Sequence, residues 1–241
     1  MKKFIHSFLY MAILGVAMSF SGKPEKMSLP LSVTFHHYAG NELLKLDSAI
    51  YKNELGQTFT ISKFKYYISN LHFKTADGKD LSINETFLIN EDEEDSKKMV
   101  LKNLPAWDYT SLEFIIGVDS LHNCSGAQSG SLDPINAMYW AWNTGYIFLK
   151  LEGHSPSSKS PGNFFEYHIG GYKQPNNCIR KVNLNISNKI TARNLDLKVN
   201  ILELFRSPTT IDFEKLSSVT DHRNAVTFAD NYSNMFEVLK K

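Results

Sequence analysis

The amino-acid sequence predicts an all-β fold, an antiparallel β-sandwich with a C-terminal helix. The chain has 241 residues, of which 42% are hydrophobic and 21% charged, so it can bury a sizeable core. Short runs rich in Val, Ile, Phe, Tyr and Thr alternate between apolar and polar residues, and turn residues separate them. A helical period occurs only near the C-terminus. All-β domains of about this length often form a single unit, so we expect one domain over residues 23–241.

The strands are expected in a regular series. In the first, residues 31–37, the alternation points His37 toward the core. The long stretch 58–74 changes phase near Ser62-Lys63, which predicts a bulge or bend. Asp77-Gly78 supplies a turn into the next strand. The remaining strands are expected at 86–90, 99–104, 111–118, 138–151, 164–169, 179–186 and 194–205.

Polar stretches connect these strands, and the tail differs from them. The charged run 91–98 and the stretches 119–134 and 154–163 are expected to be loops. From Asp221, a plausible helix cap, apolar residues recur at steps of three and four, which predicts an amphipathic helix. These residues are Val226, Ala229, Tyr232, Phe236 and Leu239.

Residues 1–22 have the pattern of a secretory signal peptide. Lys2 and Lys3 precede an apolar run at 8–20, and small residues follow it up to Gly22. The run is about 13 residues long, below the roughly 20 that a permanent membrane helix needs. An uncleaved anchor is the alternative. We therefore expect a periplasmic or extracellular protein with no stable membrane span.

The charge balance excludes one class of function. There are 26 Lys and Arg against 25 Asp and Glu, a formal net charge of +1. Removal of Lys2 and Lys3 with the signal peptide makes the mature chain slightly acidic. Proteins that bind nucleic acid usually carry a basic surplus, so we expect no nucleic-acid partner.

Cys124 and Cys178 are the two cysteines of the chain. In an oxidising compartment they can form a disulfide that closes a loop of about 55 residues. The chain-entropy model gives such a loop about 3–4 kcal/mol of stabilisation. The alternative is a pair of free thiols that bind metal.

Histidines are the clearest candidates for chemistry, because the motifs of hydrolases, nucleotide-binding proteins and zinc proteases are absent. His37 and His168 lie on separate expected strands, and imidazole binds copper, zinc and iron. Either ring can instead bond to a carboxylate or carbonyl. Glu166 shares a face with His168 and offers an acid–base pair as an enzymatic alternative.

Trp140 and Trp142 share one face in the densest aromatic stretch, residues 138–146. Core packing is the simplest explanation, since large aromatic side chains fill sandwich interiors. A redox-active pair, or a pair beside a metal, is the functional alternative. Asp119 and Asp133, in the expected long loop, are possible calcium ligands.

An ordered set of short motifs resembles the MbnP-like family of exported copper-binding proteins, from about Ser32 to Ile201. Each motif is weak alone, and their order carries the resemblance. The motifs are FHHYAG (35–40), FKYYISN (64–70), GVDS (117–120), SGAQ (125–128), LDP (132–134), MYWAW (138–142), GY (145–146), LEG (151–153) and HIGG (168–171).

The resemblance implies a β-sandwich that binds a copper ion through histidines and a tryptophan oxidised to kynurenine. It further implies that a MauG-like dihaem cytochrome c peroxidase performs the oxidation. By position, His37 and His168 would be the histidine ligands, and Trp140 or Trp142 the oxidised residue. A branch of the family with four cysteines is not matched here.

We therefore expect an exported metal-binding protein and not an enzyme. The alternative is an extracellular module that binds carbohydrate or protein through an aromatic surface. Both tryptophans on an exposed flat face would favour the module, and their burial beside two histidines would favour copper.

Overall fold

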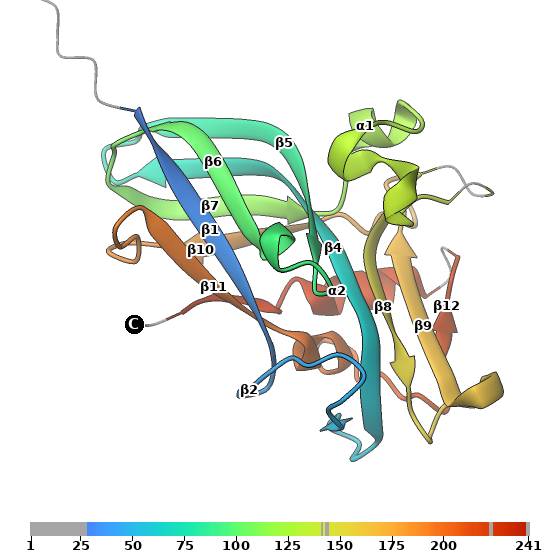
Figure 1. The fold of residues 1–241 in the computed structure, drawn as a ribbon. Coiled ribbons are helices and arrows are strands. Elements are labelled where there is room, and N and C mark those ends of the chain that lie inside the picture. The colour runs from blue at the N-terminus through green and yellow to red at the C-terminus, as the bar shows by residue number, and fades with distance from the viewer. Residues whose placement is uncertain (1–27, 141, 143–144, 222–223, 240–241) are drawn as a thin grey trace, which may run out of the picture.

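The computed structural model describes residues 28–140, 142, 145–221 and 224–239. Two β-sheets pack face to face, and a short helix near the C-terminus lies against one of them (Figure 1). The prediction of an all-β sandwich with a C-terminal helix is confirmed. The predicted signal peptide, residues 1–22, lies outside the described residues.

The smaller sheet is organised around β1, which has neighbours on both edges. The strand order is β13–β11–β1–β2, and β6 also pairs with β1. Alternate residues of β1 are buried, among them Val33 and Phe35, as its sequence pattern predicts. The strands are β1 (Ser28–Ala39), β2 (Glu42–Leu43), β6 (Lys98–Pro105), β11 (Asn194–Asn200) and β13 (Phe236–Val238).

The larger sheet is organised around β4 (Thr58–Thr75). Its strand order is β10–β7–β4–β8–β9–β12, with β3 and β5 also paired to β4. The other strands are β3 (Tyr51–Lys52), β5 (Asp80–Asn90), β7 (Tyr109–Ile116), β8 (Ile147–His154), β9 (Phe164–Gly170), β10 (Arg180–Asn185) and β12 (Ser218–Val219).

β4 is long enough to pair with two groups of strands. Residues 60–66 pair with β8, and residues 68–75 pair with β7. The register shifts between Ile61 and Lys63, which confirms the bulge predicted there. A second shift surrounds Asn70, whose φ is 51°. In Figure 1 the strands β8, β9 and β12 accordingly stand as a separate wing beside β7 and β10.

Short helices occupy the connections. None of the helices among the described residues is long and apolar enough to cross a membrane. Asp119 caps α1, and Asp133 caps η3 by accepting from the Ile135 amide at 2.9 Å, so both carboxylates have structural partners. The helices are η1 (Glu94–Lys97), α1 (Ser120–Cys124), η2 (Gly130–Leu132), η3 (Pro134–Asn136), η4 (Pro161–Asn163), η5 (Ile201–Phe205) and α2 (Ala225–Tyr232).

Several local predictions were wrong. Two strand pairs, β1 with β11 and β9 with β12, are parallel. The strand expected at 138–151 begins only at Ile147, and the one expected at 194–205 ends in η5.

The C-terminal helix is also shorter than predicted. It begins after Asn224 rather than at Asp221, and it ends at Tyr232. Phe236 to Val238 form β13 because Leu197 to Val199 offer them a free strand edge. That edge lies far away in sequence, so the helical pattern of the tail could not reveal it.

Aromatic side chains join the two sheets. The ring of Phe236, on β13, lies 5.2 Å from that of Phe114 and 5.7 Å from that of Tyr66, both on the larger sheet. Phe35 of β1 also contacts Tyr66, with ring centroids 6.2 Å apart. Because aromatic pairs contribute beyond the area they bury, this cluster stabilises the packing of the two sheets.

Replacement of Phe236 by Ala is expected to lower the free energy of unfolding by about 3 kcal/mol, because it empties the contact between the sheets. Urea denaturation of the two proteins measures the difference. Glu237→Ala in the same strand is the control. The Glu237 side chain is 62% exposed and pairs with Lys198, so the expected loss is below about 1 kcal/mol. Equal losses in the two variants would contradict this assignment.

Candidate metal-binding site

A row of polar side chains lies on the outer face of the wing formed by β8 and β9. The pairing is in register, with Lys150 opposite His168 and Glu152 opposite Glu166. Side chains directly opposite one another point to the same face of a sheet. These four residues therefore share one face, and the intervening Leu151, Tyr167 and Ile169 are buried on the other.

His168 is oriented by a carboxylate. Its Nε2 lies 2.8 Å from Oε1 of Glu152, and the two side chains are 16% and 17% exposed. The hydrogen bond with His168 lowers the pKa of the Glu152 carboxyl, against an opposing effect of burial. A metal-binding histidine commonly bonds a carboxylate through its other nitrogen. The contact with Glu152 therefore leaves Nδ1 as the nitrogen that His168 can offer to a metal.

A tryptophan-bearing hairpin covers this face next to His168. The Trp140 amide donates to the Gly145 carbonyl at 3.1 Å, and the Ile147 amide donates to the Met138 carbonyl at 2.9 Å. Trp140 is 4% exposed and lies over Gly170, where an added Cβ would come within 2.8 Å of its Cζ3. Gly170 and His168 are alternate residues of β9, so the indole lies on the same face as the imidazole.

The two tryptophans differ in their surroundings. The Trp142 side chain is 68% exposed, and its ring centroid lies 5.9 Å from that of Trp140 at an interplanar angle of 48°. The two rings therefore do not form a flat exposed platform. The arrangement matches neither expectation fully, because Trp140 is buried on the face that carries one of the two histidines, His168, and Trp142 is exposed.

His37 lies on the other side of the larger sheet. It is 3% exposed, with Nδ1 2.5 Å from Oε2 of Glu91 and Nε2 2.9 Å from the Tyr66 hydroxyl. Burial lowers the pKa of the His37 imidazole, although the hydrogen bond with Glu91 raises it. Both ring nitrogens have protein partners, so His37 has the surroundings of a structural residue of the core.

The strand register shows why the two histidines are apart. Lys65 pairs with Lys150, which pairs with His168, whereas the next residue, Tyr66, pairs with Leu149. Neighbouring residues of a strand point to opposite faces. His37 contacts Tyr66, so it lies on the inner face and His168 on the outer one. The structure does not bring together the pair of histidines that the sequence suggested as joint ligands.

Of the two alternatives for Cys124 and Cys178, a disulfide or free thiols, the structure holds both residues as free thiols. Cys124 is exposed, and its Sγ lies 3.3 Å from the Tyr172 hydroxyl. Cys178 is buried, and burial raises the pKa of its thiol to about 12. The two sulfur atoms have different surroundings, since one faces solvent at the end of α1 and the other lies within the core.

Glu166 is not the hydrogen-bond partner of His168, although the two residues share a face. His168 bonds to Glu152, while Glu166 accepts from the Ser218 hydroxyl at 3.2 Å. The sequence did not reveal Glu152 as the partner of His168, nor Glu91 and Tyr66 as the partners of His37. Alternation indicated which residues share a face within one strand, but only the cross-strand register identifies the partner.

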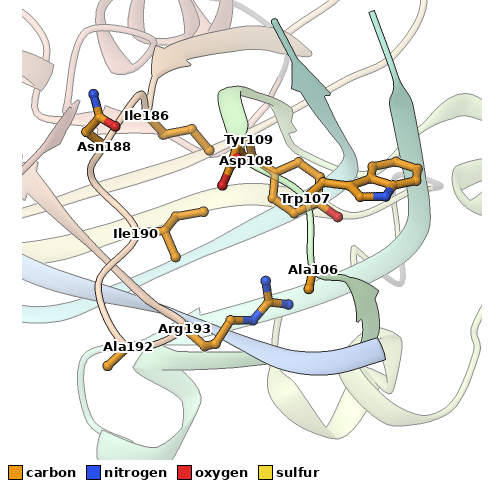
Figure 2. Close-up of a pocket in the computed structure, with 9 residues that line it drawn as sticks. All are labelled: Ala106, Trp107, Asp108, Tyr109, Ile186, Asn188, Ile190, Ala192 and Arg193. Atoms are coloured by element: carbon orange, nitrogen blue, oxygen red, sulfur yellow. The ribbon is translucent and has the colours of Figure 1, made fainter. Parts of the chain in front are cut away.

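A separate hollow of about 440 Å³ lies at the other end of the sandwich (Figure 2). Trp107, Tyr109 and Ile190 contribute apolar walls. The guanidinium of Arg193 forms another wall, and its Nη2 donates to the Leu29 carbonyl at 2.8 Å. Asp108 lies across the hollow from Arg193. The hollow shares no residue with the face that carries His168.

The fold and this face together define a class of protein, a two-sheet β-sandwich with a carboxylate-oriented histidine and a tryptophan pair on one outer face. The family model named MbnP matches residues 28–224, which include all of these residues. The chain belongs to the MbnP family.

One solved structure extends the comparison. It is MbnP from Methylosinus trichosporium, with a TM-score of 0.55 and 13% identity, over 78% of this chain and 80% of that one. At this identity the likeness concerns the fold alone. No protein with curated annotation matches the sequence.

The free energy of unfolding is expected to fall as the pH drops below 6.5, the ordinary pKa of histidine, because the fold favours neutral His37 and the unfolded chain takes up the proton first. The stability of the His37→Gln variant does not depend on protonation at this position. At pH 8 its free energy of unfolding should be about 1–3 kcal/mol below that of the wild type, because hydrogen bonds are disrupted, and this difference should shrink toward pH 5. Urea denaturation of both proteins at each pH measures the gap. A gap that widened on acidification would mean that the fold favours protonated His37.

Proposed function

We propose that this protein is an exported copper-binding protein in which His168 is a ligand and an oxidised tryptophan supplies a second donor. The observation that carries the proposal is the position of Trp140 over Gly170, on the same face of β9 as His168. Imidazole nitrogen is a good ligand for copper. The contact with Glu152 supports this role, because it presents the ring in one orientation.

The donor set explains why a modified tryptophan is part of the proposal. Among the described residues, no three His, Cys, Asp or Glu side chains form a group that could hold a metal ion. Intact indole offers no donor nitrogen, whereas kynurenine carries an aryl amine. An amine at Trp140 would lie beside His168 and complete a site with few ligands and apolar surroundings, which would suit Cu(I).

We assign the oxidation to Trp140, since its indole lies against Gly170 of β9, two residues from His168 on the same face. Trp142 is exposed and close to it, so it offers the surface contact for an oxidising partner. By family resemblance, that partner is a MauG-like dihaem cytochrome c peroxidase. The signal segment at residues 1–22 supports a periplasmic or extracellular location, where copper uptake, storage or delivery, and not catalysis, is the proposed role.

Purified mature protein is expected to bind copper as Cu(I) after co-expression with the dihaem peroxidase. Mass spectrometry of the peptide that contains Trp140 should show one carbon atom replaced by one oxygen atom. His168→Ala should weaken copper binding at least tenfold, and Glu152→Gln about tenfold, because the first loses a ligand and the second its orientation. Competition with a Cu(I) chelator measures the affinities.

His72→Ala is the matched control, since His72 lies on β4 and bonds only to Ser82 among the described residues. It should bind copper like the wild type. Trp140→Phe should abolish both the modification and tight binding of copper, because it removes the residue that is oxidised. Copper binding of wild-type strength in His168→Ala would refute the ligand assignment.

Binding of a small extracellular ligand, such as a carbohydrate, is the second candidate function. The hollow between Trp107 and Arg193 supports it, because its volume of about 440 Å³ suits a small molecule and it combines aromatic walls with charged groups. Titration with a panel of glycans, followed by tryptophan fluorescence, tests this candidate. Loss of the response in Trp107→Ala, but not in Trp142→Ala, would locate the ligand in this hollow.

A further inference from the structure

Two lysines lie beneath the entry to the tryptophan hairpin. Lys150, on β8, donates from Nζ to the Ala137 carbonyl at 2.5 Å, and Lys65, on β4, donates to the Asn136 carbonyl at 3.5 Å. The two lysines are cross-strand partners, so their ammonium groups rise side by side from the outer face. They therefore bond to two consecutive carbonyls at the end of η3.

Lys150 is unusual for a surface strand, because its residue is only 7% exposed. Among the described residues, no carboxylate lies within ion-pair distance of its ammonium. A buried lysine is rare unless it is paired, and an apolar residue would fill the same space at lower cost. The ammonium group of Lys150 therefore has a structural role: it donates a strong hydrogen bond to the Ala137 carbonyl.

The bonded carbonyl lies where the chain changes direction. Ala137 has a φ of 56°, a conformation that residues other than glycine seldom adopt. It turns the chain from η3 into the hairpin, whose first backbone pair joins Met138 to Ile147. Trp140 follows three residues after Ala137, so the lysine contact fixes the point from which the indole is presented.

The same lysine adjoins the histidine. Lys65, Lys150 and His168 form a continuous row across β4, β8 and β9, with neighbouring strands about 4.8 Å apart. Lys150 thus bonds to the entry of the hairpin and is the cross-strand neighbour of His168, the candidate metal ligand. Both side chains are held by a rigid sheet, which positions them more accurately than a loop can.

We propose that Lys150, supported by Lys65, is a positioning residue that holds the Ala137 carbonyl and thereby places Trp140 over Gly170 beside His168. The purpose of this placement rests on the proposed copper function. The placement itself is a property of the unmodified protein without metal, so it can be tested independently.

The test compares Lys150→Met, which keeps the length of the side chain but removes the donor, with Lys150→Arg, which retains a charged donor. Amide hydrogen exchange by NMR reads the hairpin at Trp140 and Ile147. Lys150→Met should exchange about tenfold faster at both amides, as expected for loss of a hydrogen bond to a charged group, while the amides of β4 keep their protection. Lys150→Arg should restore most of the difference.

Fluorescence gives a second reading in a protein with Trp107→Phe and Trp142→Phe, where Trp140 is the remaining indole. Lys150→Met should shift its emission to longer wavelength and increase quenching by acrylamide. Lys63→Met is the matched control, because Lys63 shares the outer face of β4 with Lys65, lies opposite Glu152 in the strand register, and forms no hydrogen bond with the hairpin among the described residues. It should leave both readings unchanged.

Unchanged exchange and emission in Lys150→Met would overturn the proposal. If that variant does not fold, Lys65→Met provides the same test with a smaller expected effect, and wild-type readings there would equally overturn it. Neither the amide exchange nor the fluorescence measurement involves copper, so both results would stand if the protein proved not to bind copper. With the dihaem partner co-expressed, reduced kynurenine yield in Lys150→Met but not in Lys63→Met would connect the placement to the modification.

Discussion

The register of β4, β8 and β9 determines which side chains lie on the outer face of the larger sheet and which lie in the core. Lys65, Lys150 and His168 lie in one row on the outer face, and the next row, with Tyr66, Leu149 and Ile169, lies on the inner face. A shift of one residue in this pairing would exchange the two faces. The hydrophobic inner row makes such a shift costly, so packing of the core also keeps the polar row in place.

A hydrogen-bonded group of polar side chains lies between the two sheets. His37, Glu91 and Tyr66 bond to one another, and Lys97 extends the group with its Nζ 3.3 Å from Oε2 of Glu91. Buried polar groups are tolerated when each has its partners. The network joins β1 of the smaller sheet to β4 of the larger one, beside the aromatic contacts of Phe35 and Phe236. Its place is therefore within the connection between the sheets, away from the outer face.

The outer face is polar, partly covered and built on rigid strands. His168 is oriented by Glu152, and Gly170 leaves the space into which Trp140 fits, because any larger residue would collide with the indole. An oriented imidazole and a buried indole on the same face distinguish this face as the candidate site. Membership of the MbnP family agrees with the fold, and the proposed donor from an oxidised tryptophan would give the histidine a second ligand.

The sequence by itself determined the all-β class, the bulge in β4, the strand alternation that buries His37, and the candidate status of His168 and Trp140. These follow from local periodicity and residue type, which the chain carries without reference to its partners. Only the tertiary structure decided that His37 and His168 lie on opposite faces and that Glu152 is the partner of His168. It also made the end of the tail a strand paired with β11. Each of these depends on which strand edges meet, and pairing between distant segments is set by packing of the whole core rather than by any local pattern.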